Sequence, residues 1–298
     1  MAAARFGRVL SAMVTPFDEG GGLDLDGAVE LARWLVAHGN DGLVLAGTTG
    51  EAPTLSDDEQ VELWRAVRAA VDVPLVAGTG SNDTRHACMM TEHAAAAGMD
   101  AALVVTPYYN RPSQAGLDAH FRAVAAAADL PMVVYDIPGR TGRKVDTDLL
   151  IRLANEVPNI VGLKDAAGNP AETAKVVAGT PADFDVYSGD DGMTLPLLAV
   201  GAVGVVGTST HWCGEAMSEL VAAFEKGDHF RARELNASLF ESYWYESRDT
   251  AQFALAVKVA LRVLGLPGGP CRQPLGPEPT ELEAEARAML ERLGVTRG

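Results

Sequence analysis

Short runs of apolar, mostly β-branched residues recur through the first two thirds of the chain. Most of these runs are apolar at consecutive positions and do not alternate with polar residues, so the strands they predict are covered on both faces. Strands covered on both faces are typical of parallel sheets. We predict eight such strands, at residues 9–14, 42–46, 73–77, 101–105, 132–135, 160–164, 184–187 and 203–206.

Helix start and stop signals lie between these runs. Ser56 opens a capping box, and Asn169 is a cap residue followed by proline at the first helical position. Gly39 and Gly98 follow helical stretches and are typical helix stops. Eight strand–helix units of about 30 residues each predict an α/β fold, a (β/α)8 TIM barrel of about 250 residues. A doubly wound sheet is the alternative, although it rarely contains eight such regular units.

The pattern changes after the eighth predicted strand. Residues 1–214 are predicted to form the barrel, with its last helix continuing to about residue 226. Residues 227–298 form a C-terminal helical region that contains a Pro- and Gly-rich connector at 267–279 and an amphipathic helix at 280–293. We therefore expect one barrel with a helical extension.

Composition limits the classes of function. Hydrophobic residues make up 48% of the 298 residues and charged residues 21%, as in ordinary globular proteins. The formal net charge of −16 argues against nucleic acid or an anionic membrane as a partner, because both require a basic surface. No apolar run reaches the roughly 20 residues that span a bilayer, and the first residues lack a secretory apolar core, so a cytoplasmic location is expected. The three scattered cysteines predict reduced thiols.

Lys164 is the most informative polar residue because it ends a predicted buried strand. Burial disfavours the charged form of lysine and lowers its pKa, and a neutral amine can form a Schiff base with a ketone. The alternative is a structural ion pair with Asp165 or another carboxylate. Lys258 and the lysines at other loop or helical positions are weaker candidates.

Further candidates follow other strands, at the end of the barrel where such enzymes carry their chemistry. Tyr135 can move protons, although an aromatic residue that fills the barrel is the alternative. Thr48 and Thr49 can extend a hydroxyl relay or simply form a turn. Arg140 can bind a carboxylate through two hydrogen bonds or form a surface ion pair.

A metal or an organic cofactor is not expected. The six histidines do not form a metal-ligating motif with one another or with the cysteines, and no dinucleotide fingerprint or phosphate loop is present. Asp190 and Asp191 are the one acidic pair considered as a cation site, but such a pair more often caps a helix. His211 is expected to pack near the barrel mouth.

Four motifs at the strand ends resemble the dihydrodipicolinate synthase family, and the resemblance runs from Arg8 to about Pro277. The Lys and Tyr motifs are shared with the wider group of pyruvate-dependent Schiff-base lyases, whereas Tyr109 and Arg140 are typical of the synthases. The motifs are Gly47-Thr48-Thr49-Gly50-Glu51, Val105-Thr106-Pro107-Tyr108-Tyr109-Asn110-Arg111-Pro112, Tyr135-Asp136-Ile137-Pro138-Gly139-Arg140-Thr141-Gly142 and Gly162-Leu163-Lys164-Asp165.

The resemblance implies a reaction in lysine and diaminopimelate biosynthesis. A Schiff base between Lys164 and pyruvate would attack L-aspartate 4-semialdehyde, and the assembly would be a homotetramer built as a dimer of dimers. The implied proton relay consists of Tyr135, Thr48 and Tyr109, with Tyr109 reaching across the tight dimer interface. The implied substrate-binding groups are Thr49, Arg140, Gly189 and Val206.

The sequence departs from the family pattern at two places. Asp136 stands where many relatives have asparagine, which is expected to alter only a hydrogen bond near Arg140. The positions that correspond to the lysine-binding allosteric pocket of sensitive relatives also differ, so we expect weak or absent inhibition by lysine. The altered positions are Pro53, Asp57, Gln60 and His86, and the retained ones are Asn82 and Tyr108.

Two other functions stay open at this point. One is a different aldolase of the same group, such as an N-acetylneuraminate lyase or a 2-keto-3-deoxy sugar acid aldolase. The other is a non-catalytic barrel that binds pyruvate or lysine. Arg140 favours the synthase over the first, and the combination of lysine, tyrosine and threonine favours an enzyme over the second.

Overall fold

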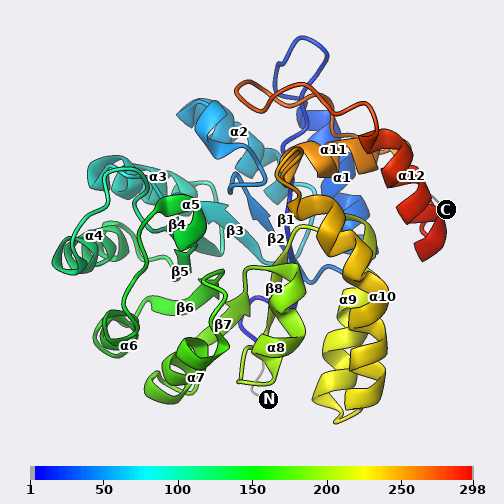
Figure 1. Cartoon of the computed structure of the whole chain (residues 1–298). Coiled ribbons are helices and arrows are strands. Elements are labelled where there is room, and N and C mark those ends of the chain that lie inside the picture. The colour runs from blue at the N-terminus through cyan, green and yellow to red at the C-terminus, as the bar shows by residue number, and fades with distance from the viewer. Residues whose placement is uncertain (1–3, 297–298) are drawn as a thin grey trace.

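The computed structural model describes residues 4–296. Its centre is a closed barrel in which neighbouring strands are parallel and follow chain order, with the eighth strand pairing with the first (Figure 1). The predicted barrel is confirmed. The strands are β1 (Val9–Ala12), β2 (Gly42–Leu45), β3 (Leu75–Gly78), β4 (Ala101–Val105), β5 (Met132–Asp136), β6 (Ile160–Asp165), β7 (Asp185–Ser188) and β8 (Gly204–Gly207).

Helices surround the barrel and continue past its last strand. The barrel helices are α1 (Leu25–Ala37), α2 (Asp57–Arg68), α3 (Thr84–Ala96), α4 (Gln114–Ala127), α5 (Pro138–Thr141), α6 (Thr147–Glu156), α7 (Pro170–Gly179), α8 (Thr194–Leu198) and α9 (Thr210–Glu225). Short 3-10 turns follow β2 and β7 at η1 (Ala52–Thr54) and η2 (Asp191–Met193). Three more helices follow: α10 (His229–Ser247), α11 (Ala254–Val263) and α12 (Leu282–Leu293).

The local signals in the sequence act as predicted. Ser56 and Glu59 form both hydrogen bonds of the capping box at the start of α2, and the Asn169 side chain caps α7. Gly39 and Gly98 have φ angles of +86° and +77° just after α1 and α3. Glycine adopts this left-handed conformation without the steric cost that a Cβ brings, so the chain can turn sharply there.

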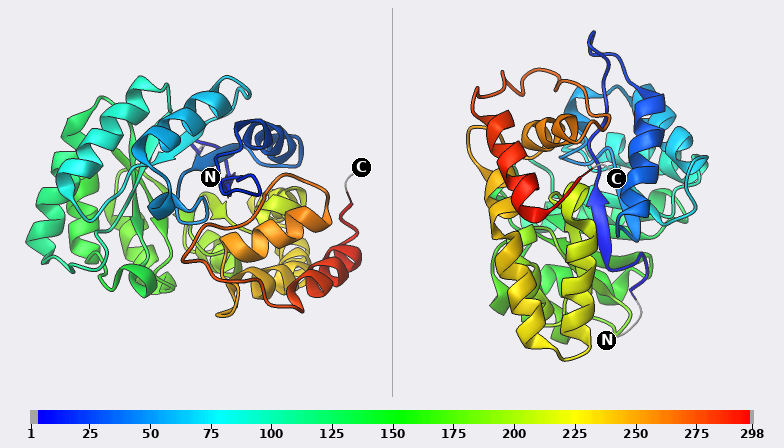
Figure 2. Two further views of the ribbon diagram at one scale, coloured as in Figure 1. Left: turned by 90° about the horizontal axis from the view of Figure 1, so that it is seen from above. Right: turned by 90° about the vertical axis from the view of Figure 1, so that its right-hand side faces the viewer.

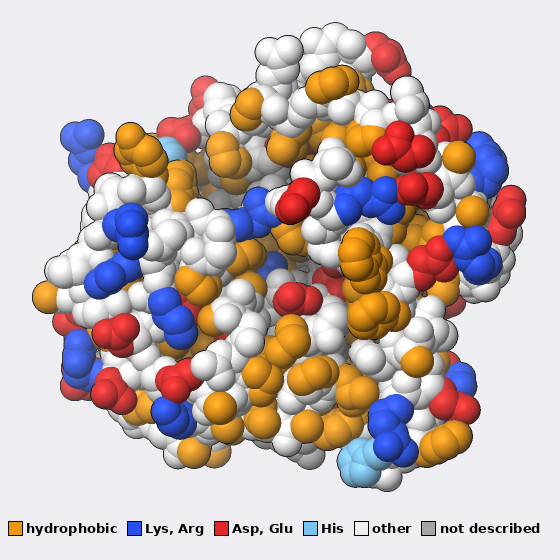
Figure 3. Space-filling model, viewed as in Figure 1, with side chains coloured by type: hydrophobic (Ala, Val, Ile, Leu, Met, Phe, Trp, Pro, Cys, Tyr) orange, Lys and Arg blue, Asp and Glu red, His pale blue; other side chains and the backbone are white. Residues whose placement is uncertain are grey.

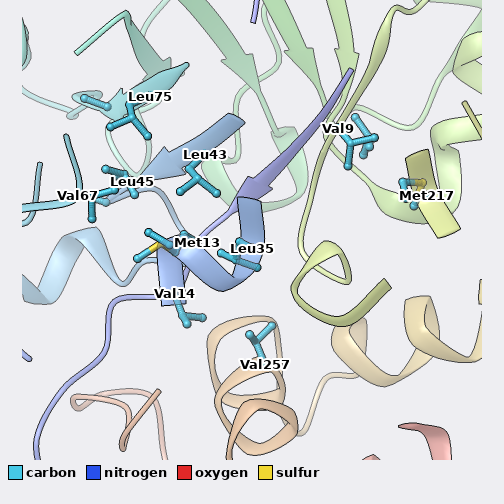
Figure 4. Close-up of a cluster of buried hydrophobic side chains, with 14 of the residues drawn as sticks. Val9, Met13, Val14, Leu35, Leu43, Leu45, Val67, Leu75, Met217 and Val257 are labelled. Carbon is cyan, nitrogen blue, oxygen red and sulfur yellow. The ribbon is translucent and has the colours of Figure 1, made fainter. Parts of the chain in front are cut away.

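Two separate layers of core explain why the strands are apolar on both faces. Inward side chains fill the barrel, among them Leu10, Val76 and Leu103, while outward ones such as Val9 and Leu43 pack against the helices. Figure 4 shows the outer layer around β1, β2 and α1. Because successive residues of a strand point to opposite faces, a polar residue at an inward position lies inside the barrel.

The last three helices lie along one side of the barrel, next to α9 and α1 (Figure 2). Helix α11 is part of the outer core, because eight consecutive residues, from Ala254 to Leu261, are buried. Its Val257 belongs to the same cluster as Val14 from the end of β1 (Figure 4). Helix α11 therefore packs in the outer core beside the segment that follows β1. None of the helices within residues 4–296 is both long and apolar enough to cross a membrane.

Candidate active site

Lys164 lies inside the barrel near the carboxyl end of β6. It is 6% exposed, and its register partners are Tyr135 on β5 and Tyr187 on β7. Gly189 follows β7, and a Cβ there would lie 3.0 Å from Cγ and 3.1 Å from Cε of Lys164. The missing side chain at Gly189 thus leaves room for the aliphatic part of Lys164.

The amine of Lys164 is kept partly neutral by its surroundings. Burial lowers the pKa of Lys164 to about 8, although the negative charges of Asp191 and Glu246 oppose this shift. Within residues 4–296, no ion pair joins Lys164 to a carboxylate. The uncharged amine, the form that attacks a carbonyl carbon, is therefore more populated near neutral pH than in an ordinary lysine, although the charged form still predominates.

Asp165 is not the partner of Lys164, which removes the structural alternative raised above. Its Oδ2 accepts a hydrogen bond from the Thr173 hydroxyl at 2.6 Å, and its Oδ1 accepts one from the backbone amide of Ala167 at 2.9 Å. The Asp165 carboxylate therefore connects the end of β6 to helix α7, and Lys164 is left without an ion-pair partner.

Tyr135 lies directly beside Lys164, whose Nζ is 4.5 Å from the centre of the phenol ring. Burial raises the pKa of Tyr135 to about 12, and a hydrogen bond to the Thr48 side chain and the charge of Arg140 moderate the rise. The phenol is therefore protonated at neutral pH and can donate its proton. Tyr135 and Thr48 are therefore the candidates for a short proton relay that starts next to the lysine.

The Thr48–Thr49 turn follows β2. Thr49 is buried, whereas Thr48 is exposed and lines a cavity of about 430 Å³ together with Tyr135 and Arg140. Glu51 ends the turn with a φ of +56°, a left-handed conformation that is uncommon outside glycine. The turn thus presents one hydroxyl to the cavity and buries the other.

Arg140 lies in the short helix α5, directly after β5. Its Nη2 donates to Gln252 Oε1 at 2.7 Å, and its guanidinium carbon is 4.4 Å from the centre of the Phe253 ring. Burial lowers the pKa of Arg140 from its usual value. A cation at the cavity wall, held from the side by the segment before α11, can bind an anionic group of a ligand.

Tyr109 lies apart from this group within the single chain. Its side chain is 90% exposed, and its backbone has a φ of +72°. Its neighbour Tyr108 lines the 430 Å³ cavity instead. Val206 is buried in β8 as part of the inner barrel core. The structure thus brings together the lysine, Tyr135 and Thr48, but not Tyr109.

The Asp136 side chain is bonded to the segment that follows α5. Its Oδ2 accepts from Lys144 Nζ at 2.7 Å, and its Oδ1 accepts from the backbone amide of Val145 at 3.1 Å. Burial raises the pKa of Asp136, while Lys144 opposes that shift. The carboxylate therefore stabilises the segment before α6 and makes no hydrogen bond to Arg140.

Two of the three predicted regulatory residues line the same cavity as the candidate relay. His86 and Tyr108 line it, and His86 Nε2 is 2.9 Å from Asp57 Oδ1. Asn82 contributes only its backbone carbonyl, which accepts from Asn110 Nδ2 at 2.8 Å. The other three altered positions, Pro53, Asp57 and Gln60, also line this cavity.

Two carboxyl groups lie near Lys164: Glu246, which sequence reasoning missed, and Asp191, which it considered only as part of a cation site or a helix cap. Asp191 and Glu246 are buried and act electrostatically on the lysine, and burial raises the pKa of Glu246. Glu246 belongs to α10 and borders a second cavity of about 460 Å³ with Gly189 and Tyr243. No local pattern marks Glu246, because its position depends on how α10 packs against the barrel. Figure 3 shows acidic and basic side chains around the hollow at the centre of this face.

The residues considered for metal binding have other roles. Asp190 caps η2, and Asp191 accepts hydrogen bonds from Thr208 and Ser209. His211 is buried, and its Nε2 accepts from the backbone amide of Val14 at 3.1 Å. Within residues 4–296, no group of three or more His, Cys, Asp or Glu side chains can hold a metal ion.

A buried, partly neutral lysine beside a phenol, at the carboxyl end of a barrel strand, is the arrangement of a barrel enzyme that attacks carbonyl substrates with an amine. The chain belongs to the dihydrodipicolinate synthetase family, whose model matches residues 5–293. The predicted family is confirmed.

Similar proteins cover almost the whole chain. The 4-hydroxy-tetrahydrodipicolinate synthase of Acidothermus cellulolyticus is 50% identical over 98% of this chain and 94% of its own. The lysine-bound dihydrodipicolinate synthase of Cyanidioschyzon merolae is 41% identical, with a TM-score of 0.95 over 98% of this chain and 99% of its own. A monomeric dihydrodipicolinate synthase variant is 33% identical, with a TM-score of 0.93 over 97% of both chains. These relatives confirm the synthase function that the sequence predicts.

Proposed function

We propose that the chain condenses pyruvate with L-aspartate 4-semialdehyde as a Schiff-base-forming lyase. Family membership supports this reaction, and the single observation that carries it is the buried Lys164 amine beside Tyr135. The lowered pKa of Lys164 supplies a nucleophile at neutral pH. The proposed reaction uses neither a metal nor an organic cofactor.

The proposed first half forms an imine. The neutral Nζ of Lys164 attacks the keto carbon of pyruvate, and the carbonyl oxygen leaves as water after it has gained two protons. Tyr135 supplies a proton to this oxygen and exchanges it through Thr48. The resulting iminium withdraws electrons, so a methyl proton is lost and an enamine forms.

The proposed second half joins the two substrates. The enamine carbon attacks the aldehyde carbon of the semialdehyde, and the aldehyde oxygen takes up a proton. The amino group of the second substrate then attacks the iminium carbon, which closes the ring and releases Lys164 as an amine. Each bond to Lys164 that forms is thus broken within one turnover.

We assign the two substrate carboxylates to different walls of the site. Thr49 and the backbone near Gly189 and Val206 would bind pyruvate, and Arg140 would bind the semialdehyde. Arg140 suits this role because Gln252 and Phe253 hold its guanidinium at the cavity that Tyr135 also lines. The division explains how a chain of net charge −16 binds two carboxylates: a few local groups carry the recognition.

Tyr109 would complete the relay from a second copy of the chain. Its 90% exposure in the single chain supports a role at an interface, because a large aromatic side chain gains stability when it is buried. We propose a homotetramer made of two such dimers. The monomeric relative with a TM-score of 0.93 indicates that the fold alone does not fix the assembly, so the oligomer requires its own measurement by sedimentation.

Lysine sensitivity is proposed to be weak or absent. The Cyanidioschyzon merolae relative is a lysine-bound enzyme, whereas this chain has Pro53, Asp57, Gln60 and His86 at the altered positions. His86 is already bonded to Asp57, which occupies polar groups that a bound amino acid would need.

We also propose a cytosolic location, as for a biosynthetic enzyme, and a boundary between the barrel and the C-terminal region near residue 227.

Two assays test the function. Borohydride added with pyruvate should reduce the imine and leave a pyruvyl mass on Lys164, and a coupled assay should show turnover of the semialdehyde with and without lysine. Labelling at another residue would contradict the proposed role of Lys164. Turnover of a sialic or keto-deoxy sugar acid without turnover of the semialdehyde would select the related aldolases, and binding without trapping would select a non-catalytic barrel.

A further inference from the structure

A fully buried ion pair connects the loop after β2 to the C-terminal helices. Lys258 Nζ in α11 donates to Glu51 Oε1 at 2.6 Å, and both side chains are 0% exposed. The same Nζ donates to the Pro270 carbonyl at 2.9 Å and lies 4.2 Å from the centre of the Phe17 ring. Removing two charges from water is costly, so a buried pair persists only when its hydrogen bonds are satisfied.

The second oxygen of Glu51 is also occupied. Glu51 Oε2 accepts from the backbone amide of Arg272 at 2.9 Å, and the Arg272 guanidinium donates to the Thr54 carbonyl at 2.7 Å and to Glu59. We call Glu51, Lys258 and Arg272 the C-terminal clamp. The clamp joins residues more than 200 positions apart, and it holds the loop at Glu51 and again at Thr54.

The loop that the clamp holds contains the Thr48–Thr49 turn. Ala46 before the turn and Glu51 after it have φ angles of +51° and +56°. Non-glycine residues keep this conformation only where their surroundings enforce it. The Glu51 amide donates to the Thr48 carbonyl at 3.1 Å, so a shift of Glu51 moves Thr48 directly.

We propose that Glu51 and Lys258 are positioning residues that hold Thr48 and Thr49 in place against Tyr135. The proposal rests on the proposed function, because it concerns the relay and the pyruvate carboxylate of that reaction. Helix α11 lies behind the loop and makes no part of the 430 Å³ cavity. The C-terminal helices thus act on the chemistry through a buried ion pair instead of through contact with the substrate.

The test compares folded variants in steady-state kinetics. Glu51→Gln alone leaves the Lys258 charge without its partner and serves as the disruptive variant. The double variant Glu51→Gln and Lys258→Met removes both charges and is the variant chosen to stay folded. Arg262→Met is the matched control, because Arg262 lies on the same helix and bonds Glu278 nearer the surface.

In the double variant, kcat is expected to fall about tenfold to a hundredfold, because small displacements of a relay group cost this much. The KM for pyruvate should rise about fivefold through Thr49, while the KM for the semialdehyde stays unchanged because Arg140 belongs to another loop. Partial unfolding would lower the apparent kcat and leave both KM values unchanged. Arg262→Met should leave all three constants as in the wild type.

Three outcomes overturn the proposal: wild-type constants in the folded double variant, equal changes in both KM values, or failure of the single and double variants to fold while Arg262→Met folds. The last would assign the pair to stability alone. If the wild type traps pyruvate but never consumes the semialdehyde, the proposed function fails. The clamp is then tested by the rate of pyruvate trapping at Lys164, which should fall in the double variant and not in the control.

Discussion

Two buried lysines in this chain have opposite surroundings. Lys164 in β6 is 6% exposed, contacts the face of Tyr135, and has no ion pair among the described residues. Lys258 in α11 is 0% exposed and is bonded to Glu51. Burial lowers the pKa of both, but at Lys258 the carboxylate of Glu51 directly opposes the shift. Burial alone therefore does not free a lysine to act as a nucleophile; it must also lack a bonded carboxylate.

The largest effect is expected from removing the nucleophile. Lys164→Ala should lower kcat by about three orders of magnitude or more, since no other amine reaches the same position. The coupled assay measures the loss, and mass spectrometry after borohydride should find no pyruvyl adduct. Activity within tenfold of the wild type would show that the two lysines had been assigned the wrong roles.

For stability we expect the opposite ranking of the two lysines: replacing Lys258 should cost more than replacing Lys164. Lys258→Met leaves the buried carboxylate of Glu51 without its cationic partner and should cost about 3–5 kcal/mol of the free energy of unfolding. Lys164→Met removes a buried amine that has no ion pair and should change stability by less than about 1 kcal/mol. Urea unfolding of both variants measures this contrast, and equal losses would contradict the distinction between the two sites.

Tyr135→Phe isolates the proton transfer beside Lys164. The phenol is protonated at neutral pH because burial raises its pKa to about 12, and its removal should lower kcat about a hundredfold. The ring remains, so the variant should stay folded and should still be labelled by pyruvate and borohydride, but more slowly. Unchanged kcat in the folded variant would remove Tyr135 from the relay.

The smallest expected effect is a shift in the pH dependence of imine formation. Imine formation requires the neutral amine, so its rate should rise with pH and level off above the Lys164 pKa of about 8. Asp191→Asn removes a negative charge that raises this pKa, so the profile should move to lower pH. Rapid mixing with pyruvate at a series of pH values measures the shift. A shift of the pH profile to higher pH would contradict the expectation that Asp191 raises the pKa of Lys164.

Much of the fold could be predicted because it depends on neighbouring residues. Strands apolar on both faces, the capping box at Ser56 and the left-handed glycines are local features, and each appears in the structure. The position of Lys164 could also be predicted, because a side chain in a strand points inward or outward by alternation. A residue at an inward position near the strand end must then face the barrel mouth.

The remaining features depend on contacts between distant segments. Nothing near Glu51 or Lys258 in the sequence shows that they pair, since 207 positions separate them. The influence of Glu246 on Lys164 likewise arises only when α10 packs against the barrel. The sequence by itself therefore determined the barrel and the inward position of its candidate lysine, whose signals are periodic and local. Only the tertiary structure decided which buried charges have partners, because charges interact through space whatever their separation along the chain.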